Sequence, residues 1–299
     1  MSKIFKRITR RNFIKSAGVA TIGIATVGIP SLADEIVSNY KTKVILIRNE
    51  NVVGDKGKIN GDIVQQMLDE AIIKLIGKKD IVSCWKEMIV PEDIVGIKTN
   101  EWANLPTTTE VEQAIKKRVM DAGVSEKNIG IDDRGVLNNP IFKNSTALIN
   151  ARPMRTHSWS GVGSLIKNYI MFDPNPPKYH ANSCASLAEV WDLPIVKGKT
   201  RLNVLVMFTP QFNTIGPHHF DKEFTWNYGG LIVGFDPVAC DTVGLKIIQE
   251  KRKLYFGDDR PIKPIAHHIQ IADTQYKLGT SDMDKIELIK LGWDKDWLI

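Results

Sequence analysis

The chain has 299 residues, with 40 Lys and Arg against 34 Asp and Glu and a formal net charge of +6. Six of the basic residues and none of the acids lie in residues 1–33, which leaves 34 of each sign in the remainder. A neutral body offers no electrostatic attraction to nucleic acid or to an anionic membrane surface, so the charge argues against both as partners.

Residues 1–33 have the three-part layout of an export signal. A basic stretch without acids, residues 1–15, precedes a weakly apolar run at 17–29, and the small-residue exit after it predicts cleavage after Ala33. The run is shorter and richer in Gly and Thr than a membrane-spanning helix, which needs about 20 strongly apolar residues. We therefore expect no stable membrane span and a mature chain over residues 34–299.

The segment TRRNFIK at residues 9–15 resembles a twin-arginine signal, whose pathway exports proteins already folded. The alternative is a general secretory signal with a chance pair at Arg10 and Arg11. The twin-arginine interpretation predicts a periplasmic or other extracytoplasmic location, with the twin-arginine export machinery as a partner. Export in the folded state is typical of proteins that load a cofactor, or join a partner, in the cytoplasm.

Apolar, β-rich runs alternate with helical patterns along residues 34–299. The expected strands are at 43–48, 93–98, 129–132, 147–151, 204–208 and 231–235, and the expected helices are at 62–76, 107–122 and 237–253. This alternation predicts an α/β fold in a single domain, with a mainly parallel sheet and helices on both faces. The proline-rich loop at 173–180 is too short to be a domain linker.

The three cysteines, Cys84, Cys184 and Cys240, are far apart in the sequence. An iron–sulfur cluster needs about four closely spaced thiolates, so we expect none within this chain. A single disulfide is an open alternative to three buried, inert thiols. The six histidines show no zinc-type spacing, so a divalent metal would need ligands from distant segments, for which His157, His180 and Asp132 are the candidates.

Ligands of α/β sheets gather where strands end and helices begin, which draws attention to polar residues at the predicted strand ends. These residues are Lys98, Asn100, Asp132, Asp133, Arg155, His157, Asp236 and Asp241. Asp236, before Pro237, is well placed as a helix N-cap, which leaves Asp241 as the better functional candidate.

The stretch RTHSWSGVGSLIKN at 155–168 places small residues between the end of a predicted strand and a helix. Gly161, Gly163 and Ser164 would leave backbone N–H groups free at the helix start, where anions bind, and Lys167 would add a full charge. The alternative is a turn whose small residues only allow close packing of the helix on the sheet.

Three patterns together resemble the domain of unknown function 362 family. They are K-x-N at 98–100, P-x-x-T-H followed by K-N within 153–168, and D-P-V-x-x-D at 236–241. The resemblance extends from about residue 44 to 250 and implies that His157, Lys167 and Asn168 form a site. Many members carry a ferredoxin-like module with clustered cysteines, which this chain lacks, and it has Arg155 where the family usually has lysine. A separate electron-transfer protein would then be a partner.

These observations predict one polar site. We assign catalytic roles to His157, Lys167 and Asp241, and ligand or cofactor binding to Lys98, Asn100, Arg155, Gly161, Gly163 and Asn168. Within it, Lys98, Arg155, His157 and Lys167 would bind an anionic group, while Asp132 and Asp241 would hold a cation or act as a base. The expected function is an exported redox or metal-assisted enzyme, and the alternative is a non-catalytic ligand-binding or accessory protein of an exported complex.

Overall fold

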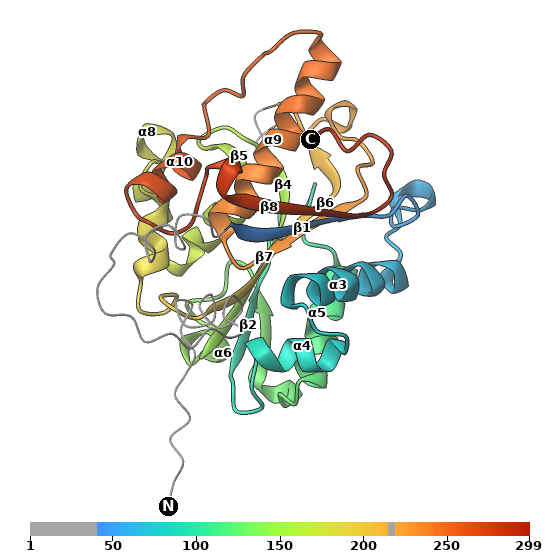
Figure 1. The fold of residues 1–299 in the computed structure, drawn as a ribbon. Helices are drawn as coiled ribbons and strands as arrows, with labels where there is room; N and C mark the ends of the chain where they lie inside the picture. The colour runs from blue at the N-terminus through green and yellow to red at the C-terminus, as the bar shows by residue number, and fades with distance from the viewer. Residues whose placement is uncertain (1–40, 215–218) are drawn as a thin grey trace, which may run out of the picture. The chain divides into compact units, whose positions relative to one another are not determined.

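The computed structural model describes residues 41–214 and 219–299, so the predicted signal at 1–33 lies outside the described residues. The described strands form one sheet in the order β3-β2-β4-β6-β7-β1-β8, with β5 paired to β4 (Figure 1). Their bounds are β1 Thr42–Arg48, β2 Val95–Lys98, β3 Ile129–Asp132, β4 Ala147–His157, β5 Gly161–Gly163, β6 Thr200–Gln211, β7 Gly230–Gly234 and β8 Ile286–Gly292.

Most of the sheet is parallel. The neighbouring pairs β3–β2, β2–β4, β4–β6 and β1–β8 are parallel, whereas β7 runs against both β6 and β1 and β5 runs against β4. The predicted α/β fold with a mainly parallel sheet is therefore confirmed, with β7 as an internal antiparallel strand.

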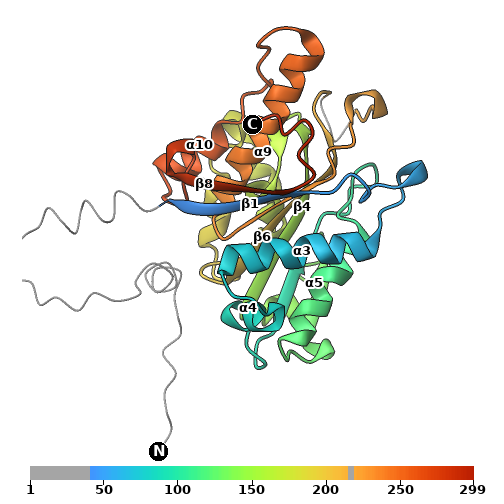
Figure 2. The same ribbon diagram turned by 45° about the vertical axis from the view of Figure 1, so that its right-hand side comes forward.

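Helices cover both faces of the sheet, as the alternation of buried side chains along β1 requires. Val44 and Leu46 belong to one apolar cluster, while Ile45 and Ile47 belong to the other. Figures 1 and 2 show α3, α4 and α5 on one side of the sheet and α9 and α10 on the other. The helices are α3 Gly61–Ile76, α4 Ile81–Met88, α5 Thr109–Asp121, α6 Pro140–Lys143, α7 Leu165–Asn168, α8 Ala181–Cys184, α9 Pro237–Phe256 and α10 His267–Thr274.

Local sequence signals account for the ends of the long helices. The Asn60 side chain accepts hydrogen bonds from the first turn of α3, and Gly77 ends that helix in the left-handed conformation. Asp236 caps α9 in the predicted way, with Pro237 at the first helical position, and Gly257 closes it. No helix within 41–214 and 219–299 is both long and apolar enough to cross a membrane.

The stretch at 155–168 differs from its prediction. The strand predicted at 147–151 continues to His157, and Gly161 and Gly163 form β5 in a hairpin with it instead of standing at a helix start. Gly161 has a φ of +73° at the turn, a conformation that favours glycine. The helix that follows, α7, is a single turn that begins at Leu165.

Candidate functional site

The three segments singled out by their motifs meet at the ends of β2 and β4. The Lys98 ammonium, at the end of β2, donates to Asn168 Oδ1 of α7 at 3.4 Å. The Arg155 guanidinium donates to Asn100 Oδ1 at 3.0 Å. Asp241 of α9, from the third segment, accepts a hydrogen bond from Leu165 N at the start of α7. The segments are far apart in the chain, so the fold itself assembles them.

Lys98 is ion-paired with Asp133, the second of the two acids after β3. Its ammonium also donates to the Thr99 carbonyl at 2.7 Å. Complete burial lowers the pKa of Lys98 to about 8, while Asp133 raises it. Asp132, a candidate metal ligand from the sequence, accepts hydrogen bonds from Gly135 N and Asn139 Nδ2 at 2.7 and 3.0 Å and stabilises the turn after β3.

Side-chain amides link this pair to the centre of the sheet. Asn168 Nδ2 donates to the Lys98 carbonyl at 3.1 Å and to Asn150 Oδ1 at 2.8 Å. Asn150 Nδ2 in turn donates to Asn203 Oδ1 at 3.1 Å. Because buried amides need such partners, this chain of amides holds α7 against β2 and β4 in one orientation.

Asp241 caps α7 from a neighbouring helix. Its carboxylate accepts hydrogen bonds from Ser164 Oγ at 2.7 Å and from the backbone N–H groups of Leu165 and Ile166, both at 2.9 Å. Complete burial raises the pKa of Asp241 to about 7, against the effect of these three donors. The N–H groups expected to receive an anion are thus bound to a carboxylate of the protein, which favours a positioning role for Asp241.

Two buried arginines lack the partners that such groups usually have. Arg152 is only 4% exposed, and its Nε makes no hydrogen bond. The Nε of Arg155 is also buried without a hydrogen bond. Asp133 and Asp241 act on Arg152 through longer-range charge interactions alone, and burial lowers its pKa to about 10. Burial and the charge of Arg152 likewise lower the pKa of Arg155. Arg155 also stacks on Trp102, with its guanidinium carbon 4.2 Å from the ring centre.

Two other buried arginines, Arg48 and Arg252, make the hydrogen bonds that Arg152 lacks. Arg48 donates from Nε to the Tyr228 carbonyl at 2.8 Å and stacks on the Tyr228 and Trp293 rings. Arg252 donates from Nη1 to the Phe212 carbonyl at 3.0 Å. An arginine buried without such bonds carries a large desolvation cost, so Arg152 needs a physical explanation.

His157 and Lys167 adjoin the two arginines. The His157 Cδ2 lies beside Gly163, which also packs against the Arg152 guanidinium. Burial and the charges of Lys167 and Arg152 lower the pKa of His157 far below its usual range, so the ring is neutral. Its Nδ1 accepts from Trp159 N at 3.2 Å, which places the proton on Nε2 and makes that atom a donor.

Lys167 is 3% exposed, and its Nζ contacts Cys184 Sγ at 3.7 Å. Burial, together with the charges of Arg152 and Arg155, lowers its pKa to about 8, while Cys184 acts in the other direction. The thiol comes from a strained segment, because Asn182, Ser183 and Cys184 have φ values of 50°, 54° and 64°. Left-handed backbone costs about 1–2 kcal/mol for each residue other than glycine, and such strain is concentrated at functional sites.

His268, on α10, also belongs to this group. It is fully buried, and neither ring nitrogen makes a hydrogen bond. Burial, Lys167 and Arg152 lower its pKa to about 3, while the Ser160 backbone, which faces the ring outside hydrogen-bonding geometry, acts in the other direction. A neutral imidazole in this state offers one N–H donor and one acceptor that the described protein atoms do not use.

The residues proposed for a metal do not fit one. Among the described residues, no group of three or more His, Cys, Asp or Glu is arranged to hold a metal ion. His180 stacks on Trp159 with ring centres 4.2 Å apart, and Asp132 is engaged in its turn. The cations around His157 would also repel a metal ion. The predicted metal set of His157, His180 and Asp132 is therefore not assembled.

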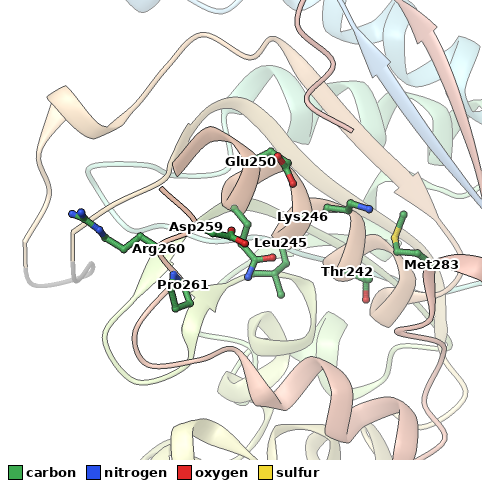
Figure 3. A pocket seen from close by; sticks show the side chains of 9 residues that line it. Thr242, Leu245, Lys246, Glu250, Asp259, Arg260, Pro261 and Met283 are labelled. Carbon is green, nitrogen blue, oxygen red and sulfur yellow. The ribbon is translucent and has the colours of Figure 1, made fainter. Parts of the chain in front are cut away.

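A cavity beside α9 shares no lining residue with this group (Figure 3). It has a volume of about 620 Å³ and lies between α9 and the segment 259–261. Lys246, Glu250, Asp259 and Arg260 line it with mixed charges, and none of them has a buried polar atom without a partner. We therefore place the candidate site at the buried cluster.

Comparison of the chain with protein-family models, with curated proteins and with solved structures finds no match. The site is therefore defined by its own geometry. We call the group of Lys98, Arg152, Arg155, His157, Lys167 and His268 the basic cluster. Arg152 and His268 are the members that the sequence analysis did not place in a site.

Proposed function

We propose that the basic cluster binds an anionic group of a small molecule. The observation that carries this proposal is the buried Arg152, whose guanidinium has no hydrogen-bonded acid beside it. The unused donors of Arg155 and His268 support it. An oxyanion accepts hydrogen bonds at every oxygen, and arginine presents its donors in the geometry that carboxylate and phosphate match.

The charge of the cluster favours an anion over a cation. Lys98, Arg152, Arg155 and Lys167 are all buried, and among the described carboxylates Asp132, Asp133 and Asp241 act against their charge. Asp133 is already paired with Lys98. The remaining excess of positive charge inside the protein is costly, and an anion would reduce that cost.

Calorimetric titration of the folded protein with sulfate, phosphate and succinate tests this proposal. We expect at least one of them to bind and to raise the melting temperature. In Arg152→Met the binding should be lost, while the unliganded protein should become more stable because an unpaired buried charge is removed. The matched control is Arg260→Met, at an arginine whose side chain is 53% exposed. This variant should bind the anions as wild type does. Unchanged binding by Arg152→Met would reject the proposal.

We propose further that residues 1–33 direct twin-arginine export to the periplasm or another extracytoplasmic space, and that the chain is a member of the domain of unknown function 362 family. The pair Arg10 and Arg11 supports the first point. The double variant Arg10→Lys, Arg11→Lys should leave folded precursor in the cytoplasm, and its normal export would indicate the general secretory route.

The proposed anion site is compatible with both functions expected from the sequence, an enzyme and a non-catalytic binding protein. Redox activity and a separate electron-transfer partner remain predictions from the family resemblance. The enzyme is favoured by one observation, the strained segment that brings Cys184 to Lys167, because binding alone does not require a reactive amine beside the anion.

A further inference from the structure

Lys167 and Lys98 are both buried lysines, but their surroundings differ. Lys98 is paired with the Asp133 carboxylate and donates to the Thr99 carbonyl. Lys167 contacts the Cys184 sulfur, and no salt bridge to it is found in the described part of the chain. Arg152 and Arg155 are cations near it that lower its pKa, whereas the Cys184 sulfur raises it. A buried amine among cations and without a carboxylate is the arrangement that makes a lysine nucleophilic.

We propose that Lys167 forms a covalent imine with the carbonyl group of a 2-oxo acid, whose carboxylate is held by the arginines of the basic cluster. This inference rests on the proposed function for its anion and adds the reacting group of the ligand. A 2-oxo acid carries the carbonyl carbon next to the carboxylate, so one small molecule satisfies both the arginines and the neighbouring amine.

The step conserves atoms and electrons without an added oxidant or reductant. The lone pair of the neutral Nζ attacks the carbonyl carbon, a C–N bond forms, and the carbonyl oxygen takes a proton to become the hydroxyl of a carbinolamine. Both protons that the oxygen takes come from Nζ. With the second one the oxygen leaves as water, the C–O bond breaks and the C=N imine remains. The reverse step with water releases the ligand unchanged.

Two features of the site assist this step. The lowered pKa of Lys167, about 8, leaves a fraction of the amine neutral near pH 7. The Nε2–H of His157, fixed by the hydrogen bond from Trp159 N to Nδ1, is a neutral donor for the carbonyl oxygen.

Reductive trapping of the full chain with pyruvate and cyanoborohydride tests the inference, with mass spectrometry to locate the adduct. We expect one reduced adduct at Lys167, formed about tenfold or more faster than at any exposed lysine. Acetone has the same carbonyl without the carboxylate, so it should label Lys167 no faster than exposed lysines. Lys197→Met, a change at a lysine whose side chain is 69% exposed, should trap as wild type.

Lys167→Arg tests the imine itself, and anion binding by the wild-type protein separates this inference from the proposed function. Arginine keeps the positive charge but does not form an imine, so the adduct should disappear in this variant. Wild-type protein that binds these anions but gives no adduct at Lys167 would overturn the imine and leave the anion site standing. Wild-type protein that binds none of them would overturn the anion site itself.

Discussion

The Asp241 carboxylate accepts the hydroxyl hydrogen of Ser164 at 2.7 Å, across an interval of 77 residues in the chain. The same carboxylate accepts the N–H groups of Leu165 and Ile166. It therefore caps a helical turn that has no cap of its own, and that turn carries Lys167 and Asn168.

Asp241→Asn tests this capping role. An asparagine keeps the shape but turns an NH₂ group toward one of three buried donors, so we expect the free energy of unfolding to fall by about 1–3 kcal/mol. Urea denaturation measures the loss. Asp258→Asn, at an exposed salt bridge with Arg260, should change stability by less than about 1 kcal/mol. Equal effects of the two substitutions would contradict the role.

Lys167 should make stability depend on pH in a defined window. Its pKa is about 8 in the folded protein against 10.5 for an unburied lysine. Between these values the unfolded chain holds a proton that the folded protein has released, so the free energy of unfolding rises with pH from about 8 to 10.5. The full effect is on the order of 3 kcal/mol.

Denaturation of wild type and Lys167→Met at several pH values isolates this contribution. The variant has no amine at this position, so the difference in unfolding free energy between the two proteins should change across that window and stay constant between pH about 6 and 7. A bound anion stabilises the ammonium form, so succinate should move the window to higher pH. A difference that does not change with pH would show that Lys167 titrates normally.

The fold was largely predictable because its signals are local. Apolar runs identified β1, β3 and β7, and the cap predicted at Asp236 agrees with the observed start of α9. β8 was missed because it lies at the edge of the sheet, where its side chains are partly exposed and the apolar signal is weak. The continuation of β4 was missed because its second half, RPMRTH, is as polar as a loop yet fully buried.

The site was predictable only in part, for a related reason. The sequence motifs identified four of its residues, Lys98, Arg155, Lys167 and Asp241. Arg152 lies in a strand where charged side chains usually point to solvent, and only tertiary packing decides that it is buried. His268 comes from a helix near the end of the chain, and no spacing in the sequence relates it to β4.

Gly161→Ala should show how tightly the hairpin packs against the segment before α10. Gly161 has a φ of +73°, and a Cβ there would lie 2.9 Å from Ala266 N and closer still to the Pro264 carbonyl. Gly198 has the same φ of +73° with nothing within 4 Å of a Cβ. Left-handed backbone should lower the free energy of unfolding by about 1–2 kcal/mol in both variants. Gly161→Ala should lower it by about 1–3 kcal/mol more, because its Cβ clashes with the neighbouring backbone. Thermal melting of the two variants measures the difference, and similar melting temperatures would mean that the segment moves aside freely.

The unpartnered imidazole of His268 gives the last prediction. A buried polar group without hydrogen bonds destabilises a protein by about 1–3 kcal/mol, so His268→Leu should make the unliganded protein more stable. If the ring contacts the bound anion, the same variant should bind succinate or phosphate more weakly. Gain of stability together with loss of binding is the signature of a residue retained for function.

The neighbouring His267 supplies the control for this experiment, because it is exposed on the same helix. His267→Leu removes an imidazole of equal size without emptying a buried position, and it should leave both the free energy of unfolding and the affinity for the anion within about 0.5 kcal/mol of wild type. Urea denaturation and calorimetric titration measure the two quantities in parallel. A His268→Leu protein that is stabilised but binds normally would place this ring outside the anion site, and one that is destabilised would mean that the imidazole packs as an ordinary core side chain.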